Sequence, residues 1–395
     1  MYCMDFRQTK KRVMLVTHTP PPILAGTGVI LRRLFRHFPK DSYVVLCSSY
    51  DDINWPLGEK LPCAYYTARV PSSLGAYSRS VAIREWMGVL PAVWKAWRVV
   101  RRERITSILS VPSAGTLLLV SCILSIAAGV ELSVYFLDLY ACNKHFKLRR
   151  WLSGPIERLA IRTAKNVFVM SEALKQHYTA KYCVETIVLP HPIELKDKVL
   201  NPSRPSAGTK DGRPAVIVFT GYIYEYQIDP LQNLAMAISG MDSVELHIYT
   251  SRSNDYLIKM GVYGKNIHYK GFVDTERIRL IQEQASILFL PMAFRPPEPA
   301  ITRTASPGKL PEYLISGRPV LVHAPEYAYI SWYARKYGWG LVVDQPDPEL
   351  LKKGIRTLLD DSVLSGRLVG NAFKTARMHE ESKVSNDLQK CMGLI

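Results

Sequence analysis

Short apolar runs alternate with helical stretches along this chain, and the alternation occurs in two separate blocks. In the first block the apolar runs predict strands at residues 13–16, 43–47, 105–111, 133–137, 166–170 and 185–189. In the second block they predict strands at residues 215–220, 244–249, 267–269, 287–291, 320–323 and 341–343. Such alternation is typical of parallel sheets, because a parallel connection needs a long crossover that is usually a helix. Each block therefore predicts a doubly wound α/β domain.

The two blocks are separated by a segment rich in proline, glycine and serine that has no helical or strand periodicity. This segment, residues 199–214, predicts an interdomain linker. We expect an N-terminal domain over residues 1–198 and a C-terminal domain over residues 215–385, with helix from about residue 350 onward. A length of 395 residues is sufficient for two full hydrophobic cores.

Cysteine usage and hydropathy indicate the compartment. The seven cysteines are widely spaced without a Cys-x-x-Cys pair, which favours a reducing compartment over a disulfide framework or a zinc ribbon. Residues 1–12 are polar and basic and lead directly into a strand, so no signal peptide is expected. The apolar run at residues 117–130 is shorter than the roughly 20 residues that span a bilayer. It predicts a buried helix followed by a strand, and we expect a cytoplasmic protein, free or at the inner face of the membrane.

The positive charge of the chain is concentrated in its first half. The net charge is +17, and residues 1–198 carry 28 Lys and Arg against 14 Asp and Glu, which predicts an anionic partner. Residues 86–104 place tryptophans at helical spacing between Lys and Arg, and a second basic cluster follows at residues 144–151. A basic amphipathic helix with Trp suits an anionic membrane surface, while the alternative is a core-facing helix with a solvated basic side. No nucleic-acid-binding motif accompanies the charge, so nucleic acid is not an expected partner.

The segment at residues 304–320 carries the strongest functional signal. Ser306-Pro307-Gly308 predicts a tight turn, followed by a short helix from about Lys309 to Gly317 and by a strand. Backbone N–H groups, a helix start and a lysine ammonium would then converge at the end of a strand, which suits a phosphate or diphosphate. Glu312, one helical turn after Lys309, can accept hydrogen bonds from ribose or sugar hydroxyls. These residues predict a site for a nucleotide sugar.

The same segment resembles the donor-binding signature of GT-B glycosyltransferases, specifically the retaining family 4 (group 1) class. That signature is Glu, seven residues, Glu, a short helix and Gly-x-Pro-Val. Glu312 matches the second Glu, and Gly317-Arg318-Pro319-Val320 matches the end of the pattern. Thr304 stands where the first Glu is expected, and residues 306–313 are closer to the variant Pro-Ser-Lys-Leu-x-Glu-Tyr. This departure concerns how the donor sugar ring is held.

The resemblance implies a particular architecture and a set of site residues. It implies two Rossmann-like domains in the GT-B arrangement with an interdomain cleft, and a C-terminal helix end, residues 386–395, that packs back on the N-terminal domain. It implies a nucleotide diphosphate sugar as donor substrate, with no cofactor and no metal. The expected catalytic residues are Lys309 and Asp138. The expected donor-binding residues are Gly26, Gly28, Gly221, Tyr222, Phe272, Val273, Ser306, Gly308, Leu310 and Glu312.

Several of these residues also have plain structural interpretations. Gly26 and Gly28 would let backbone approach a ligand at a helix start, or they form an ordinary strand-to-helix turn. Gly221 would let backbone N–H groups approach the diphosphate, and no Lys or Arg occurs between residues 219 and 229. Lys309 would therefore carry much of the phosphate charge alone. Asp138 follows a predicted strand, where it would face an acceptor or cap a helix.

The predicted function is retaining transfer of a sugar from a nucleotide diphosphate sugar to a glycan or lipid-linked acceptor, in polysaccharide or glycolipid biosynthesis. One alternative is a nucleotide-sugar epimerase of the same fold. Another is a non-catalytic sugar- or membrane-binding module, motivated by Thr304 and by the absence of a basic residue near Gly221. An NAD-dependent oxidoreductase is disfavoured, because Leu31 occupies the third glycine position of the dinucleotide fingerprint.

Overall fold

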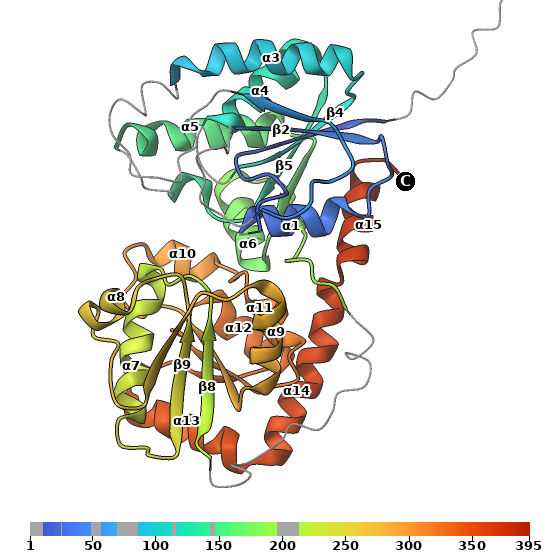
Figure 1. The fold of residues 1–395 in the computed structure, drawn as a ribbon. Helices are drawn as coiled ribbons and strands as arrows, with labels where there is room; N and C mark the ends of the chain where they lie inside the picture. Colours follow the sequence, from blue (N-terminus) through green and yellow to red (C-terminus); the bar gives the residue numbers. More distant parts are fainter. Residues whose placement is uncertain are drawn as a thin grey trace, which may run out of the picture. The chain divides into compact units, whose positions relative to one another are not determined.

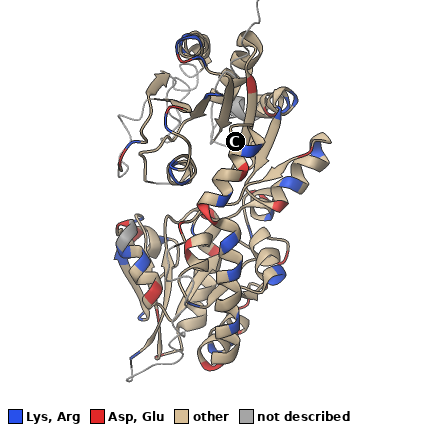
Figure 2. Ribbon diagram, turned by 90° about the vertical axis from the view of Figure 1, so that its right-hand side faces the viewer, with Lys and Arg blue, Asp and Glu red and all other residues tan. Residues whose placement is uncertain are grey.

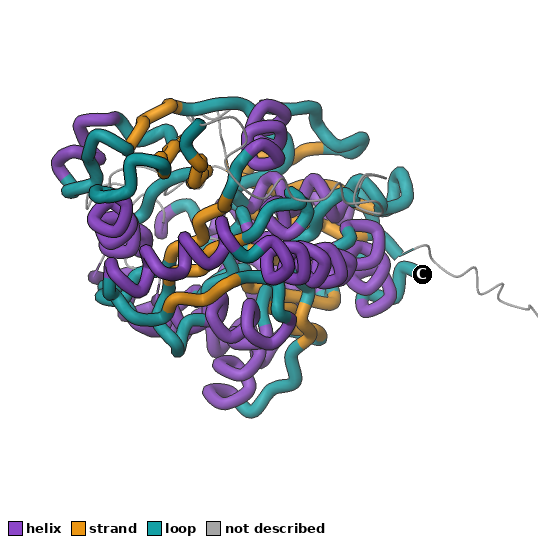
Figure 3. Tube along the Cα trace, turned by 90° about the horizontal axis from the view of Figure 1, so that it is seen from below, coloured by secondary structure: helices purple, strands orange, loops and turns teal. Residues whose placement is uncertain are grey.

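The computed structural model describes residues 11–24, 26–48, 57–68, 86–112, 116–142, 147–195 and 213–395. The chain divides into two compact units, Met1–Pro192 with Glu381–Ile395, and Ile193–Glu380. Figure 3 shows strands flanked by helices. Figure 2 shows Lys and Arg on helices of both units, interspersed with Asp and Glu. Most of the predicted linker, residues 199–212, lies outside the described residues.

The first unit contains a seven-stranded parallel sheet in the order β3-β2-β1-β4-β5-β6-β7. Its strands are β1 (Val13–Thr17), β2 (Tyr43–Ser48), β3 (Tyr65–Ala68), β4 (Ser107–Val111), β5 (Glu131–Phe136), β6 (Asn166–Val169) and β7 (Ile187–Val188). Its helices are α1 (Thr27–Phe35), α3 (Val89–Arg102), α4 (Leu117–Ala128), the 3-10 turn η1 (Tyr140–Cys142), α5 (Lys147–Thr163), α6 (Glu172–Tyr182) and α15 (Glu381–Cys391).

The apolar run predicted as a buried helix is α4, and that prediction is confirmed. Its 12 residues end where Gly129 adopts a left-handed conformation (φ 65°), and β5 follows directly. On one face of the sheet α4 packs against α3 and α5 (Figure 1). Within the described ranges, no helix combines the length and the apolar character that crossing a membrane requires.

The C-terminal helix α15 belongs to the first unit and lies against α1 (Figure 1). Ser385 Oγ donates to the Leu34 carbonyl at 2.8 Å, and Gln389 Nε2 donates to the His37 carbonyl at 3.3 Å. The buried Glu381 carboxylate pairs with the Arg36 guanidinium and lies 3.0 Å from His37 Nε2. These contacts hold α15 against the C-terminal end of α1.

The second unit contains a six-stranded parallel sheet in the order β10-β9-β8-β11-β12-β13. Its strands are β8 (Ala215–Thr220), β9 (Val244–Tyr249), β10 (Ile267–Gly271), β11 (Ile287–Pro291), β12 (Val320–His323) and β13 (Leu341–Val343). Its helices are η4 (Glu225–Gln227), α7 (Ile228–Ile238), α8 (Asn254–Lys259), α9 (Thr275–Gln284), α10 (Pro299–Thr304), α11 (Leu310–Leu314), α12 (Tyr329–Tyr337), α13 (Pro348–Asp360), α14 (Ser362–Ala376) and η5 (Arg377–His379).

The core of the second unit lies where α7 and α13 cover one face of this sheet. Leu231, Leu234, Ile355 and the strand residues Ile217 and Leu246 are all fully buried there. The sheet order and the parallel register in both units confirm the predicted doubly wound α/β class.

Two local predictions need correction. The helix expected from Lys309 to Gly317 is the five-residue α11, which ends at Leu314 with Ile315 as its C-cap, and Gly317 beyond it adopts φ 72°. The continuous helical region expected after residue 350 is divided, because Asp361 breaks from helical geometry and caps α14 by accepting from the Leu364 N–H at 2.8 Å.

Candidate functional site

The sheet order of the second unit creates a topological switch point between β8 and β11. The chain moves from β8 to β9 and β10 on one side, and from β11 to β12 and β13 on the other. Ligands of open α/β sheets bind at such points, beyond the carboxyl ends of the strands. Gly221 follows β8 directly, and the chain reaches Lys309 from β11 through α10.

Lys309 is the most unusual side chain at this edge. Its ammonium nitrogen lies 3.6 Å from the centroid of the Phe219 ring, the last apolar residue of β8. Among the described residues, Nζ is buried and has no hydrogen-bond partner. Burial lowers the pKa of Lys309 to about 7, because a charged amine without water or a partner is costly. Lys309 therefore places a buried amine, with no hydrogen-bond partner among the described residues, at this edge of the sheet.

A hydrogen-bond network fixes α11 to the end of β8 and so determines where Lys309 lies. Tyr313 Oη accepts from the Thr220 N–H at 3.1 Å and lies 3.3 Å from Thr220 Oγ1. Gln282 Nε2, at the end of α9, donates to Thr220 Oγ1 at 3.0 Å. Burial raises the pKa of the Tyr313 hydroxyl to about 12, so this group stays neutral and protonated. All three residues of the network, Thr220, Gln282 and Tyr313, are buried.

Gly221 lies beside Lys309, although not in the predicted role. Its N–H donates to the Tyr249 carbonyl at 2.8 Å, which continues the β8–β9 ladder by one residue. The prediction that this N–H binds a diphosphate is therefore wrong. Gly221 has φ 105°, and a Cβ there would lie 3.5 Å from Lys309 Cε and 3.6 Å from Nζ. Glycine at this position permits the turn, and a larger residue there would contact the Lys309 side chain.

The backbone at the start of α11 also differs from the prediction that its N–H groups face a ligand. The Leu310 N–H donates to the Pro307 carbonyl at 2.9 Å, so it closes the turn rather than facing a ligand. Leu310 itself is buried in the domain. Gly308 is exposed, and a Cβ there would meet nothing within 4 Å. Ser306 and Glu312 are half-buried beside this turn.

A basic residue that the sequence analysis missed lies at the same edge. Arg252 follows β9, and its guanidinium lies 4.3 Å from the Tyr222 ring and 4.4 Å from the Tyr256 ring. Its Nε donates to the Ile223 carbonyl at 3.1 Å, which ties it to the loop after β8. The signal was present, since a basic residue just past a predicted strand lies at its carboxyl end. The loop that lacks its own Lys or Arg thus receives one from the neighbouring strand.

The remaining predicted donor-binding residues lie after β10, at the edge of the sheet. Phe272 is 64% exposed, an unusual exposure for a phenylalanine, and Val273 is half-buried. Asp274 then caps α9 by accepting from the Arg277 N–H at 2.8 Å. The exposed ring is available for stacking.

The predicted residues of the first unit lie at the start of α1 and just after β5. Gly26 precedes α1 with φ 49°, and a Cβ there would meet no atom within 4 Å. A Cβ on Gly28 would lie 2.2 Å from the Ile23 carbonyl oxygen, so this glycine is required for close packing of its own loop. Asp138 lies two residues after β5; part of the residue is exposed, while burial of its carboxyl group raises the pKa of Asp138 to about 6.

The fold matches solved structures over nearly the whole chain. Sucrose-phosphate synthase from Thermosynechococcus elongatus aligns with TM-score 0.69 and 13% identity, covering 96% of this chain and 98% of its own. HepE from Anabaena, solved with UDP-glucose, aligns with TM-score 0.66 and 14% identity, covering 97% and 100%. A trehalose-phosphate synthase from Burkholderia xenovorans, solved with glucose-6-phosphate, aligns with TM-score 0.67 and 11% identity, covering 96% and 99%.

These alignments confirm the predicted GT-B fold, with two Rossmann-like domains. No protein-family model matches the sequence, and no curated protein matches it significantly. At these identities the similarity establishes the fold and does not establish the reaction.

Proposed function

We propose that the protein is a glycosyltransferase that transfers a sugar from a nucleotide diphosphate sugar to an acceptor with retention at the anomeric carbon. The observation that carries the proposal is the buried Lys309 ammonium, which has no hydrogen-bond partner among the described residues and lies at the switch point of the second sheet. Solved proteins of the same fold include one bound to UDP-glucose, so UDP-sugars are the first donors to test.

In the proposed reaction the bond between the sugar and the diphosphate breaks, and negative charge develops on the departing oxygen. Lys309 would stabilise that charge from a position fixed in advance, which is the most effective form of electrostatic catalysis. Arg252 would add a second positive charge at the same edge, and Tyr222 and Ser306 would add polar contacts. Glu312 would accept hydrogen bonds from the ribose, and Phe272 would stack on the base.

In the first unit we assign Asp138 and the glycine loop at Gly26 and Gly28 to the acceptor side. The Asp138 carboxyl group can bind acceptor hydroxyls at the carboxyl end of β5. We propose a glycan or lipid-linked acceptor, because the α3 helix suits a membrane surface. Such an acceptor would give the protein a role in polysaccharide or glycolipid biosynthesis.

The reaction is tested by incubating the protein with UDP-, GDP- and ADP-sugars, with and without extracts of lipid-linked glycans. We expect nucleotide diphosphate release that depends on acceptor, and NMR of the product should show the anomeric configuration of the donor. Donor conversion without an acceptor, giving an isomeric sugar, would instead identify an epimerase. Absence of both donor hydrolysis and transfer with every donor would contradict an enzymatic function.

Nucleotide binding should take up a proton above neutral pH. With a pKa of about 7, Lys309 is mostly neutral at pH 8, and a bound diphosphate would restore its charge. We therefore expect uptake of close to one proton per UDP at pH 8, and UDP affinity that falls as the pH rises above 7. Calorimetry in buffers of different ionisation enthalpy measures this number. The Lys309→Met variant should show no uptake at pH 8, and parent-like uptake in that variant would assign the proton to another group.

Helix α3 supports the membrane part of the proposal. Its inner face packs on the unit through Ala92, Ala96 and Val99, all buried. Its outer face exposes Leu90 at 74% and Trp94 at 60%. A helix with only a solvated basic side would not expose these apolar side chains. The guanidinium groups of Arg98 and Arg101 lie 4.7 and 4.1 Å from the rings of Trp94 and Trp97, so charge and aromatic surface occur together, as in interfacial helices.

Of the second basic cluster, Lys144 and the side chains of residues 147–150 lie outside the described residues.

Replacing Leu90 and Trp94 together with serine should weaken binding to vesicles containing anionic lipid. The apolar outer face would no longer insert, while the basic residues and the packed inner face would remain. Co-sedimentation with vesicles of phosphatidylglycerol and phosphatidylcholine measures the change, which we expect to be at least about tenfold. Ile126→Ser, which removes an exposed side chain of α4, is the matched control and should bind like the parent. Equal binding by all three proteins would contradict the assignment of α3.

A further inference from the structure

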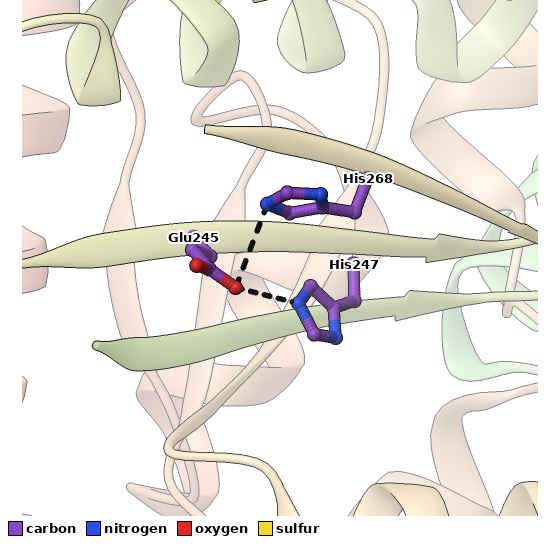
Figure 4. A group of neighbouring side chains, drawn as sticks. All are labelled: Glu245, His247 and His268. Carbon is purple, nitrogen blue, oxygen red and sulfur yellow. Dashed lines mark hydrogen bonds and ion pairs between the residues drawn. The ribbon is translucent and has the colours of Figure 1, made fainter. Parts of the chain in front are cut away.

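Two neighbouring strands of the second unit bring together three side chains that the sequence analysis did not connect. Glu245 and His247 lie two residues apart on β9, and His268 lies on the edge strand β10. His268 is the register partner of His247, and Figure 4 shows the three side chains directed toward one another. All three are half-buried.

The three groups converge through one carboxylate oxygen. Glu245 Oε2 lies 2.9 Å from His247 Nε2 and 3.5 Å from His268 Nε2. The two imidazole rings meet edge to face, with centroids 5.2 Å apart. One donor atom from each residue lies within 4.8 Å of the others. Because ligands of one metal ion are typically about 3 to 4 Å apart, this spacing needs only small side-chain rotations to close around an ion.

The cluster has no part in the hydrophobic core. Val244, Leu246 and Ile248 alternate with these residues along β9 and are fully buried on the opposite face. One carboxylate and two imidazoles therefore meet outside the core, and these are donor groups that transition-metal ions take from proteins.

We propose that Glu245, His247 and His268 bind a single divalent transition-metal ion of the Zn²⁺ type. Two imidazoles and a carboxylate are a ligand set that Zn²⁺ accepts, with water in the fourth position, whereas Ca²⁺ and Mg²⁺ require mainly oxygen ligands. The ion would replace the present hydrogen bonds and join the edge strand β10 to β9. That strand leads into the loop carrying Phe272, so the ion would stabilise this edge of the sheet. The proposal does not depend on the proposed transferase activity.

The test uses tag-free protein, because a polyhistidine tag would bind the same ions. We expect Zn²⁺ titration calorimetry to give one site per chain and Zn²⁺ to raise the Tm. Co²⁺ should give a visible absorption band that Zn²⁺ abolishes. His268→Ala and Glu245→Gln should each weaken Zn²⁺ binding at this site by at least about tenfold. Two variants are tested so that the experiment remains valid if one of them misfolds.

His177→Ala is the matched control, since it removes a half-buried histidine on α6 of the other unit. It should bind Zn²⁺ like the parent. Absence of Zn²⁺ and Co²⁺ binding by the parent would overturn the proposal. Unchanged affinity in both His268→Ala and Glu245→Gln would do so as well, by assigning the ion to other groups such as the exposed Cys183 thiol.

Discussion

Replacement of Lys309 with methionine is expected to lower the rate of sugar transfer by about 10²–10³-fold. Methionine preserves the length and the contact with Phe219, and it removes the charge that would meet the departing diphosphate. Since that charge acts mainly in the transition state, kcat should fall together with kcat/KM. Steady-state kinetics with the donor identified by the screen measures both quantities.

The same variant should not be less stable than the parent. Lys309 holds its ammonium in a buried position without a hydrogen-bond partner among the described residues, so its removal relieves a desolvation cost in the nucleotide-free protein. We expect an unchanged or higher Tm, which separates loss of activity from loss of fold. Lys353→Met, which removes an exposed lysine on α13, is the matched control and should retain full activity. Parent-like transfer and nucleotide affinity in Lys309→Met would refute the assignment.

The strands of the second unit could be predicted from the sequence almost residue by residue. The bounds of β8, β9, β11, β12 and β13 agree with the apolar runs, because β8, β9, β11 and β12 are buried on one or both faces of the sheet and β13 is a continuous apolar run that is half-buried. By contrast, β3 was not predicted. It is an edge strand with residues Tyr65, Tyr66 and Thr67 partly exposed, so it lacks the continuous apolar run that identifies a buried strand.

The candidate site could be predicted only where it depends on local sequence. Lys309 could be predicted from the sequence of the turn that precedes it. In the structure its side chain lies at the end of β8, and Nζ has no hydrogen-bond partner among the described residues. Arg252 depends on which strand lies next to β8, and the Glu245 cluster depends on the register of β9 against β10. The role predicted for the Gly221 N–H also depends on strand pairing. This N–H donates to the Tyr249 carbonyl as one further hydrogen bond between β8 and β9.

Removal of Glu157 should destabilise the first unit more than the loss of any exposed carboxylate. This buried residue of α5 accepts hydrogen bonds through both oxygens. Oε1 accepts from Lys181 Nζ and Tyr182 Oη, both at 2.7 Å. Oε2 accepts from the Ala141 N–H at 3.0 Å and from Tyr178 Oη at 3.2 Å. Glu157→Ala would leave these donors without their acceptor, at a cost of about 3 to 5 kcal/mol in the free energy of unfolding.

Denaturant unfolding followed by circular dichroism measures that cost, and Glu131→Ala provides the comparison. Glu131 is exposed and pairs with Lys165, so its loss should cost less than about 1 kcal/mol. Glu157→Gln keeps the shape and removes the charge, and we expect an intermediate loss, since an amide oxygen still accepts from two of the donors. Because the hydrogen bond from the Ala141 N–H to Glu157 anchors the turn that follows Asp138 to α5, the Gln variant should also lower the transfer rate under conditions where it remains folded. A Glu157→Ala protein as stable as Glu131→Ala would show that the four hydrogen bonds do not hold this turn and the α5–α6 pair together.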